Sequence, residues 1–589
     1  MSEIMRAALG IERSLSGQRW QWRTGGDGET LRPDELVDRI LLSRGAPPDR
    51  LEDWRRPSLR AFLPDPSVFA DMDTAVARIC AAIDAGEAIA VYGDYDVDGA
   101  TSAALLIRLL RMLGVEARPY IPDRLLEGYG PSADALVRLK REAIDLVITV
   151  DCGAQAFEAL GAARDAGLDV IVVDHHQCST SLPPAFALVN PNRLDDSPEA
   201  RAHGHLAAVG VAFLLGAAIV RRLRGQARFA PGNEPDLLSL LDIVALGTVA
   251  DVAKIQGLNR AFVAQGLKVM ARRQNVGLAA LADVAGLKKA PGSHELGFAL
   301  GPRINAGGRV GQADLGVRLL MTEDADEARR IATELDRLNE ERRAIEAAVT
   351  EQAIALADAT GNAPVVVVAG EGWHPGVIGI VAGRLKERLG RPAIVIALGE
   401  DGTGKGSGRS IAGVDLGSAV IAARDSGLLV AGGGHAMAAG LTVAPGGVEP
   451  LARWLCDRLE SDVETASASR SLSLDALLAP RGINPDFAAA IEAGGPYGHG
   501  WSQPRVASGP ARLVRCDVVG NGHVRFIASG DDGGSFKGIA FRAADGEMGQ
   551  ALLGCGSGRR LWLAGRVRVE EWQGRIAAEL HLDDAAFAD

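Results

Sequence analysis

Short apolar runs alternate with helical patterns along the first half of the chain. The apolar runs are Ile89–Tyr92, Ala117–Ile121, Leu146–Val150 and Val170–Val173, and the helical patterns between them are Thr101–Leu113, Ser132–Glu142 and Gln155–Ala166. Runs of this length are typical of strands buried on both faces. Strands that alternate with helices predict a parallel sheet covered on both sides, so we expect an α/β fold that begins near Asp71. The mixed N-terminal residues 1–60 are expected to form a helical lead-in.

A second α/β pattern follows a long charged stretch. The stretch Asp324–Ala357 contains neither proline nor glycine and predicts a long connecting helix. Beyond it, Val365–Val368 and Ala393–Ala397 have the character of strands, and Val377–Leu389 has that of a helix. The chain therefore contains two separate α/β units.

The C-terminal part changes to glycine-rich segments and short strands. We expect turns at Gly402–Ser410 and Gly432–Gly440, and a linker at the Ser- and Ala-rich segment Thr465–Leu472. Short strands are predicted at Leu513–Val519, Val524–Ala528, Phe536–Phe541, Leu561–Val569 and Ile576–Leu582. The first two are separated by Asn521-Gly522, a typical hairpin turn. Five such strands predict a small β-barrel of the OB-fold type.

Composition bounds these predictions. The chain has 589 residues, enough for roughly three or four domains of about 150 residues. Hydrophobic residues make up 47% of the chain, which supports large cores and argues against general disorder. The net charge of -12 gives no overall basic signature of a nucleic-acid-binding protein, although a local arginine cluster is sufficient for such binding.

Cysteine usage and the apolar runs indicate the cellular compartment. The 6 cysteines are scattered without a Cys-x-x-Cys pair, which argues against a disulfide framework or a cysteine zinc site. The N-terminal segment lacks the apolar core of a secretory signal. The longest apolar run, Leu206–Val220, falls short of the roughly 20 residues of a membrane span and predicts a buried helix. We expect a cytoplasmic protein that does not associate with membranes.

Acidic residues follow the apolar segments. Asp94, Asp96 and Asp98 follow the run Ile89–Tyr92, and Asp151 follows Leu146–Val150. Asp174 with His175 and His176 follows Val170–Val173, and Asp251 follows the helical segment Leu237–Leu246. Because the carboxyl ends of parallel strands meet at one edge of a sheet, these side chains should converge. Carboxylates at alternate positions repel one another, and a bound cation would remove that cost. The alternative is a solvated acidic turn that caps a helix.

The donor types limit the chemistry of this cluster. Carboxylates with imidazoles and without thiolates suit Mn²⁺, with Mg²⁺ as an option and zinc less natural. Asp151, which follows the expected middle strand, is placed to bridge two ions. Two ions about 3.5–4 Å apart are a common device for in-line phosphoester hydrolysis. A single histidine at a strand end is more often structural, but two adjacent ones beside carboxylates favour a metal role.

Four segments resemble the motifs of the DHH phosphoesterase superfamily: DYDVDG (94–99), VDCG (150–153), VDHH (173–176) and GTVAD (247–251). The later segments GRS (408–410) and GGGHAMAAG (432–440) resemble the associated DHHA1 substrate-binding domain. Their order, with GPRINAGGR (301–309) and a C-terminal barrel, most closely resembles that of bacterial single-strand-specific 5′→3′ DNA exonucleases. The resemblance extends from about Asp71 to the C-terminus.

The resemblance implies a set of roles at the acidic cluster. The metal ligands, for two Mn²⁺ or Mg²⁺ ions, would be Asp94, Asp96, Asp151, His175 and Asp251. Asp98 and Asp174 would be neighbouring catalytic acids, and His176 would orient the scissile phosphate or assist the leaving group. Which two of the first three aspartates touch metal stays open. Tyr92 stands where some members of the superfamily carry a ligating histidine.

The resemblance also implies a substrate-binding set. Ser407 and Arg409 would hold the 5′-terminal phosphate with help from Arg303 or Arg309, because arginine forks and glycine amides suit phosphate. The remaining candidates are Arg124 and Tyr129 near the cut, and His374, Arg384, Gly433, Gly434 and His435 in the second α/β unit. For each arginine alone, an ordinary surface charge is an equal alternative.

The implied domains are a lead-in (1–70), a DHH domain (71–322), a connecting helix (323–360), a DHHA1 domain (361–462) and a linker with an OB-like domain (463–589). The implied function is release of 5′-mononucleotides from single-stranded DNA in DNA repair and recombination, by a monomer. Expected partners are a single-stranded DNA 5′ end, a single-strand-binding protein and a RecQ-type helicase. One alternative is a phosphoesterase for pyrophosphate, cyclic dinucleotides or short oligonucleotides. The other is a non-catalytic scaffold, which the filled acidic positions disfavour.

Overall fold

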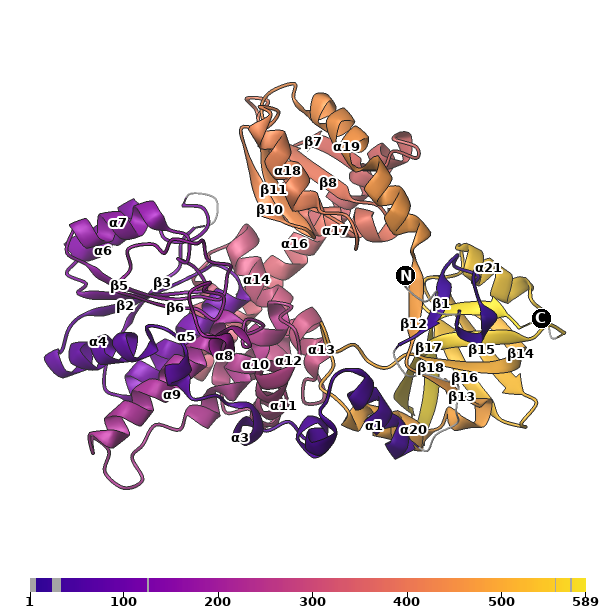
Figure 1. The fold of residues 1–589 in the computed structure, drawn as a ribbon, viewed down its shortest axis with the longest axis horizontal. Coiled ribbons are helices and arrows are strands. Elements are labelled where there is room, and N and C mark those ends of the chain that lie inside the picture. The colour runs from indigo at the N-terminus through magenta and orange to yellow at the C-terminus, as the bar shows by residue number, and fades with distance from the viewer. Residues whose placement is uncertain (1–6, 24–32, 124–126, 557, 573–574, 589) are drawn as a thin grey trace. The chain divides into compact units, whose positions relative to one another are not determined.

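The computed structural model describes residues 7–23, 33–123, 127–556, 558–572 and 575–588. The chain divides into two units (Figure 1). The DHH unit, so called for its Asp174-His175-His176 segment, comprises residues 33–339 and 489–503. The C-terminal unit comprises residues 1–32, 340–488 and 504–589. The helix α16 (Ala325–Ala359) confirms the predicted long helix, and the division between the two units falls inside it.

A five-stranded parallel sheet forms the DHH unit, in the order β3-β2-β4-β5-β6. The strands are β2 (Ile89–Gly93), β3 (Arg118–Tyr120), β4 (Leu146–Val150), β5 (Asp169–Val173) and β6 (Ala187–Val189). The first four confirm the predicted strands, and β4 is the middle strand as expected. Alternate side chains of β4 enter different cores: Ile148 packs on one face and Val147 on the other. This double burial explains the unbroken apolar runs.

Helices cover both faces of this sheet. One core contains residues of α4 (Met72–Ala85), α5 (Val97–Met112) and α9 (Ala208–Gly225), and the other contains residues of α6 (Ala133–Arg141) and α7 (Phe157–Asp165). The other α-helices up to α16, with the π-helix η5 (Leu296–Leu300), are α1 (Pro33–Ser43), α2 (Leu51–Arg55), α3 (Leu59–Phe62), α8 (Pro198–Arg201), α10 (Leu241–Ala250), α11 (Gly257–Met270), α12 (Val276–Val284), α13 (Ser293–Glu295), α14 (Gly301–Val310) and α15 (Leu315–Met321). Short 3-10 helices are η1 (Ala8–Gly10), η2 (Pro48–Arg50), η3 (Pro66–Val68) and η4 (Leu237–Leu240). Within the described part of the chain, none of the helices combines the length and apolar character that crossing a membrane requires.

The C-terminal unit contains a mixed sheet in the order β10-β11-β9-β8-β7. Its elements are β7 (Val366–Glu371), α17 (Ile378–Leu389), β8 (Ala393–Leu398), β9 (Gly404–Arg409), α18 (Leu416–Asp425), β10 (Ala431–His435), β11 (Ala438–Val443) and α19 (Val448–Ala468). The expected glycine-rich turn at Gly402–Ser410 is wrong, because most of this segment is strand β9. The one at Gly432–Gly440 is right only for Ala436 and Met437, which form the turn between β10 and β11. Large neighbours fill the space that the glycines leave: a Cβ at Gly406 would lie 2.5 Å from Leu441, and one at Gly408 would lie 2.7 Å from Leu416.

Five C-terminal strands close into a barrel, which confirms the predicted fold. They are β14 (Val506–Val519), β15 (His523–Gly530), β16 (Ser535–Ala540), β17 (Leu561–Trp572) and β18 (Arg575–Phe587), joined in a ring by the pairing of β14 with β17. Additional elements are β12 (Ser471–Leu474), β13 (Ala476–Leu478), α20 (Pro485–Ala493) and α21 (Glu547–Gly554). The expected linker at Thr465–Leu472 is wrong, because its first residues belong to α19 and its last ones to β12.

The N-terminal segment contains an unexpected strand, β1 (Arg19–Trp22). It pairs in parallel with β12, so Trp20 lies opposite Leu472. Trp20 is fully buried, and its indole N–H donates a hydrogen bond of 2.8 Å to the Asp584 carboxylate on β18. The expectation of a purely helical lead-in is therefore wrong, because β1 packs with the barrel.

Candidate active site

The turn between β2 and α5 presents three aspartates at alternate positions. Asp94 follows β2, Asp96 caps the N-terminus of α5, and Asp98 lies in the first turn of that helix. The Asp96 carboxylate accepts hydrogen bonds from the backbone N–H groups of Asp98 and Gly99, at 2.9 and 3.1 Å. A Cβ at Gly99 would lie 2.3 Å from the Asp94 carbonyl oxygen, so this turn requires glycine. Helix capping thus applies to Asp96, but Asp94 and Asp98 are buried carboxylates rather than a solvated turn.

Asp151 lies at the centre of the sheet edge, directly after β4. Its backbone has a φ of 61°, a left-handed conformation uncommon for residues other than glycine. Its side chain is buried. Burial raises the pKa of Asp151 well above its usual range, and the charges of four nearby aspartates raise it further. These aspartates are Asp96, Asp98, Asp94 and Asp251. A strained residue with a strongly shifted pKa marks a candidate functional site.

Potential ligand atoms gather in three overlapping groups along this edge. In each group they lie within 4.8 Å of one another, and the groups are Asp94, Asp96 and Asp151; Asp151, His175 and His176; and Asp98, His175 and Asp251. Asp151 and His175 each belong to two groups. A carboxylate that belongs to two such groups could bridge two adjacent metal ions.

The His175 ring is oriented for ligation. Its Nε2 lies 3.2 Å from Oδ1 of Asp151 and 3.9 Å from Oδ2 of Asp98. Its Nδ1 lies 3.0 Å from the carbonyl oxygen of Leu206, which can only accept a hydrogen bond. The hydrogen of a neutral ring therefore belongs on Nδ1, and the Nε2 lone pair faces the carboxylates. A metal-bound imidazole has this tautomer.

His176 and Asp174 form a tight pair beside this cluster. His176 Nδ1 lies 2.7 Å from Oδ1 of Asp174, while Oδ2 of Asp174 accepts a hydrogen bond from the Ala154 N–H at 2.9 Å. Burial acts to raise the pKa of Asp174, but these partners outweigh it and lower the pKa to about 2. Burial likewise opposes protonation of His176, but Asp174 and the other carboxylates raise its pKa. The pair can thus supply an ionised acid and a protonated imidazole.

Two helix ends complete the edge. The Asp98 carboxylate accepts hydrogen bonds from the N–H groups of Ala208 and Val209 at the start of α9, at 2.7 and 2.9 Å. Burial nevertheless raises the pKa of Asp98. Asp251 follows α10, and burial with the charges of Asp98 and Asp96 raises its pKa well above the usual range. The acids predicted from four separate segments are therefore brought together.

Two asparagines that the sequence reasoning missed position the histidine backbone. The side-chain amide of Asn190 donates a hydrogen bond to the His176 carbonyl oxygen at 2.8 Å, and that of Asn192 donates one to the His175 carbonyl oxygen at 2.6 Å. Both follow β6, the strand that was not predicted. The available signal was the short apolar run Ala187–Val189 ending in polar residues, as the other strands do.

The aromatic candidates near the cluster separate into two kinds. Tyr92 is buried and engaged with other partners: its hydroxyl donates a hydrogen bond to the Gly130 carbonyl oxygen at 3.0 Å, and its ring stacks on Tyr120. Tyr129 is exposed, and its hydroxyl lies 3.2 Å from His176 Nδ1. The predicted strand contact Arg124 lies outside the described residues.

The C-terminal unit brings Ser407 and Arg409 together on one face of β9. The Arg409 guanidinium donates hydrogen bonds to Ser407 Oγ at 3.1 Å and to the Gly408 carbonyl oxygen at 2.8 Å. A Cβ at Gly379, in the first turn of α17, would lie 3.0 Å from each of the two side chains. Arg409 and Ser407 thus face the N-terminus of a helix, where backbone N–H groups favour an anion. We name this group of three residues the β9 cradle.

The other residues predicted to contact the substrate differ in the partners that their side chains already have. Arg384 is paired with buried Glu346, and Arg303 donates a hydrogen bond of 2.8 Å to the Asp336 carboxylate. His374 Nδ1 accepts a hydrogen bond from the Gly376 N–H at 3.0 Å. The remaining candidates are Arg309, half-buried on α14, and Gly433, Gly434 and exposed His435 on the edge strand β10.

The acidic edge fits hard divalent cations. Its donors are carboxylate oxygens and an imidazole, the set preferred by Mn²⁺ and also compatible with Mg²⁺. Three of the carboxyl groups, those of Asp98, Asp151 and Asp251, have raised pKa values because they are buried with like charges nearby. A bound cation would reverse this cost.

Comparisons with known proteins agree with this site. The sequence matches the DHH family N-terminal domain over residues 88–248, the DHHA1 domain over residues 362–460 and the RecJ OB domain over residues 474–584. The single-stranded-DNA-specific exonuclease RecJ of Dickeya dadantii is 35% identical over 579 residues, which cover 96% of this chain and 98% of that protein. The Escherichia coli RecJ is 34% identical over 563 residues, which cover 93% and 95%.

Solved structures show the same fold. RecJ from Thermus thermophilus in complex with Mn²⁺ has a TM-score of 0.75 and 31% identity, with coverage of 93% of this chain and 75% of that chain. The same protein in complex with Mg²⁺ has a TM-score of 0.69 and 29% identity, with coverage of 94% and 74%.

Proposed function

Because the chain belongs to the RecJ family of single-stranded-DNA-specific exonucleases, we propose that it degrades single-stranded DNA from the 5′ end to 5′-mononucleotides in a metal-dependent reaction. The observation that carries this proposal is the convergence of carboxylates and imidazoles on Asp151, in the centre of the sheet edge. DNA repair and recombination are the processes that use such an activity.

The acidic edge is the proposed metal centre, with Mn²⁺ or Mg²⁺ held by Asp94, Asp96, Asp151, His175 and Asp251. Bound divalent ions would activate water and stabilise the negative charge on the phosphate oxygens. Asp98 stabilises the geometry through its bonds to the start of α9. A hollow of about 590 Å³ beside His175 and Asp251, lined also by Arg201 and Lys254, offers room for a nucleotide.

His176 is proposed to act on the reacting phosphate. Asp174 holds its Nδ1 at 2.7 Å and favours the protonated ring. A protonated imidazole can orient the scissile phosphate or give a proton to the leaving oxygen. Tyr129, within hydrogen-bond distance of the same ring, is proposed to contact the strand near the cut, as is Arg124.

The β9 cradle is proposed to anchor the 5′-terminal phosphate. Arg409 and Ser407 supply a charge-assisted and a neutral donor, and α17 supplies backbone N–H groups. Arg303, Arg309, His374, Arg384, Gly433, Gly434 and His435 are secondary candidates for strand contacts. Arg303 and Arg384 already bind carboxylates, so Arg409 is the leading candidate for the anchor.

The barrel is proposed to bind the strand further along. On its surface the Phe541 ring is exposed and lies 5.3 Å from the His523 ring and 5.0 Å from the His581 ring. The strand register places Arg525 and Lys537 on the same face as these rings. Rings next to basic side chains suit bases and backbone phosphates of single-stranded DNA.

The cellular setting follows from the family alone. We propose a cytoplasmic monomer that works with a single-strand-binding protein and a RecQ-type helicase. The domain limits proposed are 71–322 for the DHH domain, 361–462 for the DHHA1 domain and 463–589 for the region that contains the barrel, with 1–70 as the N-terminal segment and 323–360 as the connecting helix.

The test is hydrolysis by the purified chain with Mn²⁺, using long single strands labelled at either end. Release of labelled mononucleotide from the 5′ end before the 3′ end is expected. Cleavage restricted to di- or trinucleotides or cyclic dinucleotides would instead assign the chain to the small-substrate phosphodiesterases. No hydrolysis of any of these substrates would indicate a scaffold.

A further inference from the structure

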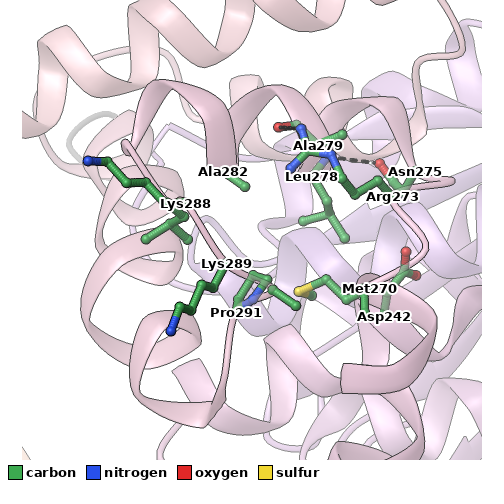
Figure 2. A pocket seen from close by; sticks show the side chains of 13 residues that line it. Asp242, Met270, Arg273, Asn275, Leu278, Ala279, Ala282, Lys288, Lys289 and Pro291 are labelled. Atoms are coloured by element: carbon green, nitrogen blue, oxygen red, sulfur yellow. Dashed lines mark hydrogen bonds between the residues drawn. The ribbon is translucent and has the colours of Figure 1, made fainter. Parts of the chain in front are cut away.

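A second cavity lies in the DHH unit among α10, α11, α12 and the loop that follows α12. Its volume is about 150 Å³ (Figure 2). Figure 2 shows Leu278 and Ala282 on one side of the cavity and Met270 with Asp242 on the opposite side. A cavity of this volume accommodates a ring of benzene size. The cavity therefore suits one six-membered ring.

The buried walls of this cavity are apolar apart from the side chains of Asp242 and Asn275. The Asn275 amide is engaged, because its oxygen accepts from the Leu278 N–H and its nitrogen donates to the Leu320 carbonyl oxygen. Met270, Leu278 and Ala282 are buried, and Asp242 beside them is only 2% exposed. One oxygen of Asp242 accepts a hydrogen bond from the Ile243 N–H at 2.8 Å. A carboxylate has more acceptor positions than this bond uses. A ring that enters should therefore carry an N–H donor on its edge.

The rim of the cavity is basic. Lys288 and Lys289 line it from the loop after α12 and are exposed to solvent. Arg273, which precedes α12, is paired at 2.6 Å with the carboxylate of Asp283 in the last turn of that helix. Two ammonium groups at the mouth attract a phosphate attached to the ring that enters. The site thus combines an apolar slot, a buried acceptor and a cationic mouth.

We propose that this cavity binds a cytosine nucleoside 5′-phosphate. The ring of cytosine has the required size, its exocyclic amino group donates to a carboxylate, and its phosphate reaches the lysines. Thymine presents a carbonyl oxygen in place of that amino group, and its only free ring donor, N3–H, lies between two carbonyl oxygens that a carboxylate repels, so it should bind less tightly. The proposal rests on the proposed function only in that hydrolysis of DNA releases such a nucleotide; the binding itself requires neither metal nor hydrolysis.

The cavity is separate from the metal-binding edge but shares a helix with it. Asp242 lies in the first turn of α10, and Asp251 follows the last residue of that helix. Ten residues of α-helix extend about 15 Å, which sets the scale of the separation. A variant of the acidic edge should therefore leave binding in the cavity unchanged.

Binding of dCMP and dTMP to the full-length chain, measured by isothermal titration calorimetry without divalent metal, tests the proposal. We expect dCMP to bind at least tenfold more tightly than dTMP, both to the wild type and to Asp151→Ala. Asp242→Ala should weaken dCMP binding at least tenfold, and Lys288→Glu about threefold to tenfold. Lys268→Glu is the matched control, since its exposed side chain carries the same charge on α11 outside the cavity.

Three results would contradict the proposed nucleotide site. Equal affinity for dCMP and dTMP, unchanged binding in both Asp242→Ala and Lys288→Glu, or loss of binding in Asp151→Ala would overturn the proposal. Lys288→Glu alters only an exposed side chain, so misfolding of Asp242→Ala would not prevent this conclusion. A short oligodeoxycytidylate distinguishes the free nucleotide from the end of a strand as the ligand. If the oligonucleotide displaces dCMP, the cavity also binds a strand end; if it does not, the cavity binds the free nucleotide alone. An unchanged dCMP affinity in a chain that hydrolyses no DNA would separate this site from the proposed function.

Discussion

The candidate sites on the two α/β sheets of this chain carry opposite charges. At the edge of the DHH sheet, buried carboxylates converge on Asp151, and their mutual repulsion and burial raise its pKa. At the β9 cradle of the C-terminal sheet, the cationic Arg409 guanidinium is held in place by hydrogen bonds to Ser407 Oγ and the Gly408 carbonyl oxygen. The first site is destabilised until a cation binds, while the second is already arranged for an anion. A site that needs a metal can thus be distinguished from one that needs a phosphate by its electrostatic cost.

The largest effect is expected at the acidic edge. Asp151→Ala removes the carboxylate common to two ligand groups, so hydrolysis at saturating Mn²⁺ should fall at least a thousandfold, about 4 kcal/mol of barrier. Steady-state kinetics on a long single strand would measure this loss. Asp165→Ala, an exposed carboxylate on α7, is the control and should retain full activity. Asp151→Ala activity within tenfold of the wild type would exclude a bridging role.

Asp242 is a buried acid outside the acidic edge of the DHH sheet, and it should make the stability of the fold depend on pH. Burial raises the pKa of Asp242 to about 6 from an ordinary value of 3.8. Between these pH values the folded protein retains a proton that the unfolded chain has lost, so the free energy of unfolding decreases as pH rises. Asp242→Asn should abolish the part of this fall in unfolding free energy that the Asp242 carboxyl causes, on the order of 3 kcal/mol. Equilibrium unfolding of both proteins from pH 4 to pH 7 measures the difference, and parallel curves would show that Asp242 does not carry it.

The β9 cradle should show a smaller effect that depends on the substrate end. A charge-assisted arginine contact contributes roughly 1.5–3 kcal/mol, so Arg409→Ala should cost about tenfold to a hundredfold on 5′-phosphorylated strands. Strands with a 5′-hydroxyl should lose much less, because the strongest partner is already absent. Lys386→Ala, a charge removed from the same helix α17, is the control. Equal losses on both substrates would mean that another group sets the polarity.

The smallest effect is expected at the barrel. Stacking on one aromatic ring contributes roughly 1–3 kcal/mol per base, so Phe541→Ala should weaken binding of a long single strand about tenfold. Cleavage of a very short strand should change little. Val514→Ala, which truncates an exposed side chain of β14, controls for loss of surface apolar area. If short and long strands are affected alike, the barrel is a structural support.

The DHH sheet could be predicted because its strands are buried on both faces. That burial requires unbroken apolar runs, and the acids that end them are visible in the sequence. The partners of these acids were less visible. Asn190 and Asn192 act through β6, a strand of three residues that is too short to give a clear pattern.

The glycine-rich strands and the N-terminal strand could not be predicted, for two different reasons. Gly404–Arg409 has few side chains with which to show alternation, and its conformation depends on Leu441 and Leu416, which fill the space over the glycines. The partner of Trp20 is more than five hundred residues away in sequence: Asp584, on β18. Deletion of the whole barrel would expose this buried indole, which is why a point substitution at Phe541 is the cleaner test.

The number of Mn²⁺ ions bound to the wild type and to Asp151→Ala tests the central claim most directly. Equilibrium dialysis with metal analysis measures it independently of hydrolysis. If the acidic edge holds two ions joined through Asp151, the wild type should bind two and the variant at most one, with the fold unchanged by circular dichroism. Two ions of unchanged affinity in Asp151→Ala would contradict the account.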